Sequence, residues 1–243
     1  MSKPLAEAAR PQCWADVAGQ DEAVAAIRSA IDTGGWGGRA WWITGVSGTG
    51  KTTICKLIAA EGASDWTTVE VRANGLTPAG VEALEAKYAG RSLFGGWCIV
   101  VNECHGLRKD TVTALLDALE RLPSCCCWVF TTTCQGQARF FADDENGDTA
   151  PLVSRCQEIR LVDTPESRLA LARRVKAVAM AAGCDGFDER VYVAALNACK
   201  GNARMLLQRV ESGQLAAEVK HHASKVEAER PVLAATGPRK GAK

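Results

Sequence analysis

Short apolar runs alternate with segments of helical periodicity along the first two thirds of the chain. Apolar or β-branched runs predict five strands, at residues 40–44, 67–71, 97–101, 127–133 and 157–162. Helical segments lie between them, at residues 52–60, 80–88 and 110–122. The run at 97–101 is apolar throughout, as expected of a strand that is buried on both faces. This order of elements predicts an α/β fold, a parallel sheet sandwiched by helices.

The pattern changes after Val162. Thr164 and Pro165 form a helix-start signal, and helical spacing continues to about residue 182. Two more helical segments follow, near residues 189–199 and 203–210. The sequence therefore predicts three regions. They are an α/β domain at 1–162, a small all-helical domain at 163–213, and a polar, flexible tail at 214–243.

Composition and charge narrow the classes of protein. A hydrophobic content of 47% is enough for a packed core and excludes global disorder. The formal net charge is +1, so the chain as a whole is not a general binder of polyanions. Contact with nucleic acid would need a local basic patch. Arg108 and Lys109, just before a predicted helix, are candidates, although exposed basic residues there are more often plain surface.

The eleven cysteines do not have the placement of a disulfide scaffold or a zinc ribbon. No C-x-x-C pair occurs, and the consecutive residues Cys125, Cys126 and Cys127 lead into an apolar strand, where neighbouring side chains alternate between faces. The N-terminal segment lacks a signal-peptide core, and no apolar run is long enough to cross a bilayer. These observations favour buried, reduced cysteines in a cytoplasmic protein with no membrane partner.

The segment GVSGTGKT, residues 45–52, matches the phosphate-binding P-loop pattern at every fixed position. It directly follows a predicted strand and opens a predicted helix, which is the context that the pattern requires. Glycines let the backbone amides curl inward toward phosphate oxygens, and the helix N-terminus favours an anion. An ordinary glycine-rich turn is the alternative. The predicted ATP-binding residues are Gly45, Val46, Ser47, Gly48, Thr49, Gly50, Lys51 and Thr52, with Lys51 reaching the phosphates and Thr52 binding magnesium.

A second candidate element follows the apolar run at 97–101. A P-loop enzyme needs an acidic group at the end of a neighbouring strand for its magnesium shell, and a group that orients the attacking water. Glu103 fits the water-orienting role, and its alternative is a solvated residue after a strand. Asn102 stands where the metal-side Asp is expected. Its amide keeps an oxygen acceptor but has no charge, so we expect a weaker hold on magnesium.

These motifs and several further stretches, in order, resemble clamp-loader subunits within the AAA+ ATPases. The resemblance is to the bacterial DNA polymerase III gamma/tau and delta-prime type and to the replication factor C small-subunit type. It covers about residues 14–210. Besides the P-loop and the NECH segment, it rests on WADVAGQDEAV at 14–24, FTTT at 130–133, SRC at 154–156 and GNARMLL at 201–207.

The resemblance implies further roles for individual residues. Val17 lies in the N-terminal box, which packs against adenine in the family. Thr133 corresponds to the sensor that contacts the γ-phosphate or the water, with Thr132 as a near rival. Arg155 corresponds to a finger that completes the ATP site of the neighbouring subunit. Arg204 corresponds to the second sensor, which reports nucleotide state through lid closure. The implied ligands are ATP and Mg²⁺, and the implied partners are other AAA+ subunits, a sliding clamp and primed or double-stranded DNA.

The sequence also departs from the family. Asn102 replaces the Asp, the connection at 134–151 is long and acidic, and the cysteine-rich zinc module is missing. Residues 214–243 are too few for the family's collar domain, so none is expected. Three hypotheses remain: a clamp-loader-like ATPase, another DNA-linked AAA+ ATPase such as a helicase loader or branch-migration motor, and a regulatory subunit with little turnover. The SRC segment favours the first over the second, and Asn102 keeps the third open.

Overall fold

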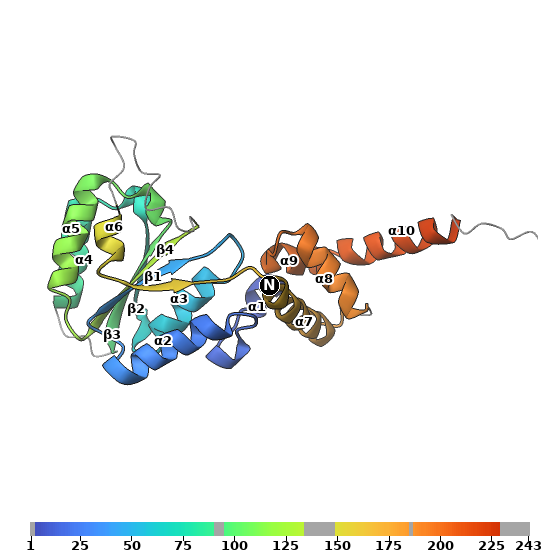
Figure 1. Cartoon of the computed structure of the whole chain (residues 1–243), viewed down its shortest axis with the longest axis horizontal. Helices are drawn as coiled ribbons and strands as arrows, with labels where there is room; N and C mark the ends of the chain where they lie inside the picture. Colours follow the sequence, from blue (N-terminus) through green and yellow to red (C-terminus); the bar gives the residue numbers. More distant parts are fainter. Residues whose placement is uncertain (1–2, 90–94, 134–148, 185–186, 229–243) are drawn as a thin grey trace, which may run out of the picture.

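The sheet of the α/β domain has five parallel strands in the order β2-β3-β4-β1-β5 (Figure 1). The computed structural model describes residues 3–89, 95–133, 149–184 and 187–228. The α/β fold is confirmed, with each strand within a few residues of its predicted range. The strands are β1 (Arg39–Thr44), β2 (Ala63–Arg72), β3 (Gly96–Asn102), β4 (Cys126–Thr132) and β5 (Gln157–Arg160).

Helices cover both faces of this sheet, which confirms the sandwich. One face packs on α4 (Pro78–Ala89), α5 (Lys109–Glu120) and the short α6 (Ala150–Val153), and the other on α2 (Asp21–Gly34) and α3 (Lys51–Ala60). Side chains alternate along β4 because a strand turns successive residues to opposite faces. Trp128 and Phe130 therefore join the α4/α5 core, and Val129 joins the α2/α3 core.

The cysteines divide between the core and the surface. Cys126 and Cys127 are buried on opposite faces of the sheet, as alternation predicts. Burial raises the pKa of the Cys127 thiol well above its ordinary value, which disfavours the reactive thiolate. Among the cysteines that the structure describes, the expectation of burial is wrong at three positions, because they lie outside the packed strands and helices or at their ends. The exposed ones are Cys13, Cys125 and Cys184.

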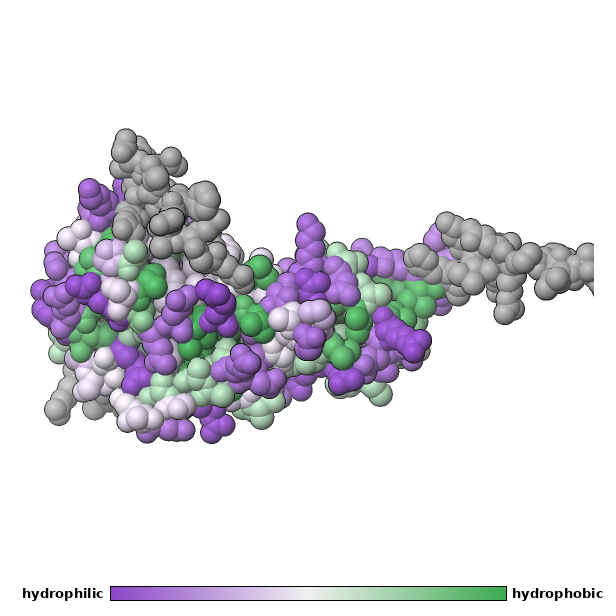
Figure 2. All heavy atoms as spheres, in the orientation of Figure 1, coloured by the Kyte–Doolittle hydropathy of each residue, from purple (hydrophilic) through white to green (hydrophobic). Residues whose placement is uncertain are grey.

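The smaller helical unit packs around its own apolar core. Its helices are α7 (Pro165–Ala181), α8 (Glu189–Ala198) and α9 (Ala203–Glu211). Thr164 caps α7 in a capping box with Ser167, and Asn202 caps α9 by accepting a hydrogen bond from the Met205 amide. On the face shown in Figure 2, hydrophobic residues are scattered among hydrophilic ones over both units.

Two terminal segments pack differently from the prediction. The first residues, expected with the α/β domain, include α1 (Leu5–Ala8), which lies against α9, and the Leu5 amide donates to Glu211 Oε1 at 3.0 Å. The expected flexible tail begins as α10 (Gln214–Ala228), because buried Leu215 anchors it to the helical core. Neither α10 nor any other described helix is long and apolar enough to span a membrane.

Short 3₁₀ turns complete the described elements, and two of them adjoin site residues. They are η1 (Trp14–Asp16), η2 (Ala73–Gly75) and η3 (Cys104–Gly106). Most of the long acidic connection at 134–151 lies outside the described residues, as does the end of the predicted tail, 229–243.

Candidate nucleotide-binding site

The loop between β1 and α3 has the backbone of a phosphate cradle. Gly48 and Gly50 have φ values of 92° and 102°, a region that residues with a Cβ rarely adopt. Lys51 begins α3 and folds back over the loop, donating from Nζ to the carbonyl oxygens of Gly45 at 2.7 Å and Val46 at 3.1 Å. The loop therefore puts an ammonium group and a helix N-terminus at one point, which is suited to an anion.

A pocket of about 320 Å³ lies between this loop and the helical unit. It brings together most of the residues predicted from sequence, drawn from several elements. Those lining it are Val17, Ser47, Gly48, Thr49, Gly50, Lys51, Thr52, Glu103, Thr133 and Arg204. Four predicted residues do not line it: Gly45, Val46, Asn102 and Arg155. Gly45 and Val46 contribute instead through the carbonyl oxygens that Lys51 binds.

Lys51 and Glu103 bring opposite charges to the lining of the pocket. Partial burial lowers the pKa of the Lys51 ammonium from its ordinary value, and the Glu103 carboxylate opposes that shift. Both side chains line the pocket, one from the P-loop helix and one from the end of β3. A cation held near a carboxylate in a partly dehydrated cleft is typical of catalytic sites.

Glu103 has a strained backbone at the end of β3. Its φ of 60° and ψ of 51° lie in the left-handed region, which costs a residue with a side chain about 1–2 kcal/mol. Its carboxylate oxygen Oε2 lies 3.3 Å from His105 Nδ1, without hydrogen-bond geometry, and its side chain is 52% exposed. The backbone is thus fixed while the carboxylate remains accessible. Such strain persists where surrounding contacts enforce it, often at functional sites.

Asn102 is engaged by the neighbouring strand. Its Oδ1 accepts a hydrogen bond from Thr131 Oγ1 at 3.1 Å, and the Glu103 amide donates to the same Thr131 oxygen at 3.4 Å. Thr131 was not predicted as a site residue. Its role depends on the register between two strands far apart in the sequence, which no local pattern reveals.

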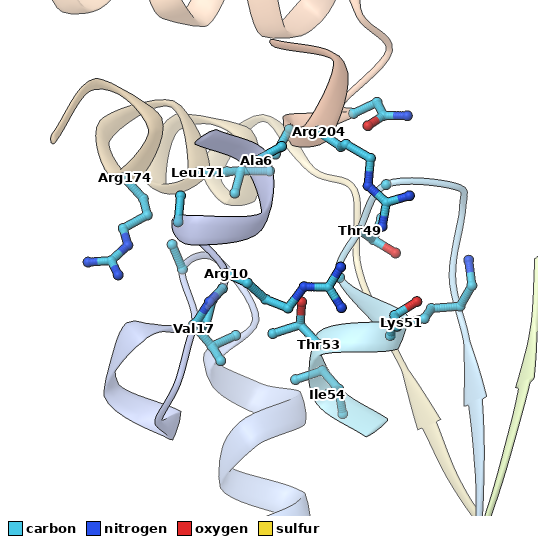
Figure 3. Close-up of a pocket in the computed structure, with 18 of the residues that line it drawn as sticks. Ala6, Arg10, Val17, Thr49, Lys51, Thr53, Ile54, Leu171, Arg174 and Arg204 are labelled. Atoms are coloured by element: carbon cyan, nitrogen blue, oxygen red, sulfur yellow. The ribbon is translucent and has the colours of Figure 1, made fainter. Parts of the chain in front are cut away.

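The helical unit and the N-terminal segment form the opposite wall of the pocket. Figure 3 shows the side chains of Arg204, from the start of α9, and Arg10, from the segment after α1, pointing into the pocket toward the P-loop. Within the described part of the chain, neither guanidinium forms a salt bridge. Sequence reasoning missed Arg10. The apolar part of this wall comprises Ala6, Leu171, Val175, Val178 and Leu207.

The two walls touch directly at Gly48. A Cβ at this position would lie 2.7 Å from the Cα of Asn202, the residue that caps α9. Glycine is therefore needed here for close approach as well as for its positive φ. The P-loop and the cap of the helix that carries Arg204 are in contact, so a movement of one affects the other.

A side-chain clamp holds the connection between the two units. Gln20 Nε2 donates to the Val162 carbonyl at 2.8 Å, and the Val162 amide donates to Gln20 Oε1 at 2.9 Å. Arg168 then pairs with Asp163 through two hydrogen bonds of 2.6 and 2.7 Å, which lower the pKa of the Asp163 carboxyl. The joint between the domains thus has specific polar contacts at residues 162 and 163.

Arg155 lies outside the pocket. Its Nη2 donates to Glu120 Oε1 on α5 at 2.8 Å, and its Nη1 donates to the Pro151 carbonyl at 3.2 Å. The side chain is 40% exposed. Arg155 is therefore presented on the surface and does not contact the pocket of its own chain.

Comparisons with known proteins identify the fold. No family model matches the sequence, and no curated protein matches it. A structure of a RuvB point mutant from Thermotoga maritima matches with a TM-score of 0.62 and 17% identity, over 90% of this chain and 67% of that chain. The structure titled as the T. maritima RuvB Holliday junction branch migration motor has a TM-score of 0.63 and 18% identity, over 86% of this chain and 67% of that chain.

A polymerase III gamma subunit-related protein from T. maritima has a TM-score of 0.48 and 14% identity, over 63% of this chain and 49% of that chain. The RuvB matches, at their low identities, show the fold alone. Together with the parallel sheet and its P-loop, they show that this chain has the fold of the AAA+ P-loop NTPases.

Proposed function

We propose that this chain binds ATP with Mg²⁺ and hydrolyses it as an AAA+ ATPase. The observation that carries the proposal is a single pocket that gathers Lys51 and Thr52 of the P-loop with the strained Glu103. A phosphate cradle beside an accessible carboxylate is the arrangement that phosphoryl transfer to water requires.

The residues of the cradle have distinct roles in this proposal. The P-loop amides and the Lys51 ammonium bind the β- and γ-phosphates, as the positive-φ glycines and the position of Nζ permit. The Thr52 hydroxyl and the Asn102 amide oxygen are the groups that would hold magnesium. When bound, that ion neutralises charge on the phosphate oxygens.

The remaining pocket residues contact the attacking water, the γ-phosphate and the adenine ring. Glu103 orients the attacking water, and Thr133, just after β4, hydrogen-bonds to the water or the γ-phosphate. Arg204 contacts the γ-phosphate from the opposite wall and couples lid position to nucleotide state. Val17, with the apolar residues of α7, packs against adenine.

Arg155 acts in trans in this proposal. Its exposed guanidinium and its position outside the pocket of its own chain support a role at a neighbouring subunit. There it stabilises charge that develops on the transferred phosphoryl group. The active form is then an assembly of AAA+ subunits, with each site completed by the next chain.

The assembly acts on DNA. We favour a clamp-loader-like task, on a sliding clamp and primed DNA, because SRC at 154–156 and GNAR at 201–204 occur in the family's order. Arg108 and Lys109, both exposed at the start of α5, are candidate phosphate contacts. A branch-migration motor is the second candidate, favoured by the structural similarity to RuvB over 90% of this chain.

Turnover measurements with different DNA partners test the function. ATP hydrolysis is measured for the chain alone, with primed DNA, with primed DNA plus a sliding clamp, and with a four-way junction. The clamp-loader task predicts the highest rate with clamp and primed DNA together. Highest stimulation by the junction favours the second candidate. ATP binding without turnover under every condition supports the regulatory alternative and contradicts the ATPase proposal.

Subunit mixing tests the trans role of Arg155. Arg155→Ala should keep ATP binding but lose turnover by about a thousandfold or more in the assembly. Glu103→Gln should also lose turnover, and a mixture of the two variants should recover activity that neither has alone. Arg160→Ala, another exposed arginine nearby, is the matched control and should retain turnover. Failure of the mixture to recover, with mixed assembly confirmed by native mass spectrometry, would contradict the trans role.

A further inference from the structure

Asn102 and Thr131 lie side by side on the face of the sheet that α3 covers. Strands β3 and β4 pair in parallel, with Val100 opposite Val129 and Val101 opposite Phe130, so the next pair along is Asn102 and Thr131. Val100 and Val129 belong to the α2/α3 core. Because side chains alternate along a strand, Asn102 and Thr131 point to that same side, toward the P-loop helix.

The Thr131 hydroxyl forms two hydrogen bonds with this end of β3. It donates its proton to Asn102 Oδ1 at 3.1 Å and accepts from the Glu103 amide at 3.4 Å. Thr131 is only 2% exposed, so water competes little for these bonds. One buried hydroxyl on β4 thus joins the side chain of Asn102 to the backbone of Glu103.

The hydrogen bonds of Thr131 help to fix the backbone of Glu103. The left-handed backbone of Glu103 is unfavourable for a residue with a side chain and persists only if its surroundings enforce it. The hydrogen bond to Thr131 is one such contact, and it fixes the amide from which the Glu103 side chain projects. The carboxylate itself is half exposed and near His105, so its position depends on the backbone.

We propose that Thr131 is a positioning residue for hydrolysis, which holds Asn102 and Glu103 in place through its single hydroxyl. In this chain a neutral network of hydroxyl, amide and backbone stands where a P-loop enzyme commonly has a metal-side Asp. Thr131 thereby sets the position of the water-orienting carboxylate without contacting nucleotide. The inference rests on the proposed ATPase function and specifies how its catalytic carboxylate is held.

Two substitutions at position 131 separate the hydroxyl from the shape of the side chain. Thr131→Val keeps the shape and removes both hydrogen bonds, and Thr131→Ser keeps the hydroxyl. We expect Thr131→Val to lower kcat by about ten- to a hundredfold, because small displacements of a catalytic group have effects of that size. The dissociation constant for ATP should change by less than about threefold, because the P-loop is untouched. Thr131→Ser should restore most of the turnover.

A matched control and a double variant isolate the role. Thr111 is a fully buried threonine on α5 whose hydroxyl donates to the Leu76 carbonyl at 3.1 Å, and it has no proposed role in hydrolysis. Thr111→Val should lower thermal stability and leave kcat unchanged. In an Asn102→Ala background, Thr131→Val should lower kcat by a smaller factor than it does in the wild type, since the two residues share one hydrogen bond.

The outcomes distinguish this inference from the ATPase proposal. If the wild-type chain hydrolyses ATP and Thr131→Val is equally fast, the inference is overturned and the proposed function stands. The same holds if Thr131→Ser does not restore turnover. It also holds if the fold-losses in kcat from Asn102→Ala and Thr131→Val multiply in the double variant. If the wild-type chain hydrolyses no ATP in any assembly, both this inference and the ATPase proposal are contradicted.

Discussion

The two walls of the nucleotide pocket are built by different means. The P-loop wall consists of backbone. It is the turn between β1 and α3, it has positive-φ glycines, and residues of β1 and α3 are buried in the core. The lid wall is side chains: Arg10, Arg204 and an apolar surface from α1, α7 and α9. Contacts that hold it against the first wall include the Gln20 clamp on Val162 and the close approach of Asn202 to Gly48.

We expect this difference to separate nucleotide binding from the sensing of nucleotide state. A cradle of backbone amides cannot easily change shape, because its geometry is fixed by the strand and helix that flank it. A wall of side chains on a separate helical unit can shift as that unit shifts. We expect the P-loop wall to supply most of the affinity for phosphate. We expect the lid wall to add affinity for the nucleoside and to convert occupancy into domain movement.

The largest effect should come from the charged group of the P-loop wall. Lys51→Ala removes the ammonium that lies over the cradle, and hydrogen bonds to charged groups contribute about 1.5–3 kcal/mol each. We expect affinity for ATP to fall by about a hundredfold or more. Inorganic tripolyphosphate, which has no nucleoside, should lose affinity to the same extent. Isothermal titration calorimetry measures both.

The matched control for this change lies on the same helix. Lys56 is exposed on α3 and does not line the pocket, so Lys56→Ala should bind ATP as the wild type does. Unchanged ATP affinity in Lys51→Ala would contradict the assignment of the P-loop wall itself.

An intermediate effect is expected from the arginines of the lid wall. Arg204→Ala and Arg10→Ala each remove one guanidinium that points into the pocket, and we expect about a tenfold loss of ATP affinity for each. Arg190→Ala, at an exposed position of α8, is the control and should have no effect. Titration with fluorescent ATP analogues measures the losses. A loss as large as that of Lys51→Ala would show that the lid wall, too, is primary for binding.

The P-loop wall was predictable from sequence and the lid wall largely was not. The eight-residue motif fixes local backbone geometry wherever a strand precedes it and a helix follows. Arg10 has no comparable signal, because it lies in a short polar segment whose position is set by the packing of α1 on α9. Sequence spacing showed that Arg204 begins a helix, but only the tertiary structure brings it together with Arg10.

The same distinction explains the terminal segments and Thr131. Neither α1 nor α10 has a strong helical pattern in the sequence. Leu215 of α10 is buried in the helical core, and Leu5 of α1 packs against that core. Thr131 was part of a predicted strand, yet its contacts with Asn102 and Glu103 arise from the register between β3 and β4. Local pattern predicts elements well, whereas contacts between distant elements need the fold.

The smallest effect on binding should come from the clamp that joins the two walls. Gln20 is buried, and its side-chain amide satisfies both the carbonyl and the amide of Val162. Gln20→Leu keeps a side chain of similar volume but leaves both backbone groups without that partner. Buried polar groups left unsatisfied cost about 1–3 kcal/mol, so thermal unfolding should occur at lower temperature. ATP affinity should fall only about threefold, because the cradle is intact and only the lid wall is less well placed. Tripolyphosphate affinity should not change, which distinguishes a displaced lid from a damaged P-loop.

Gln208→Leu, at an exposed position of α9, is the control and should alter neither stability nor binding. An equal loss for ATP and tripolyphosphate in Gln20→Leu would mean that the two walls are one mechanical unit, and that binding and sensing are not separated in this protein.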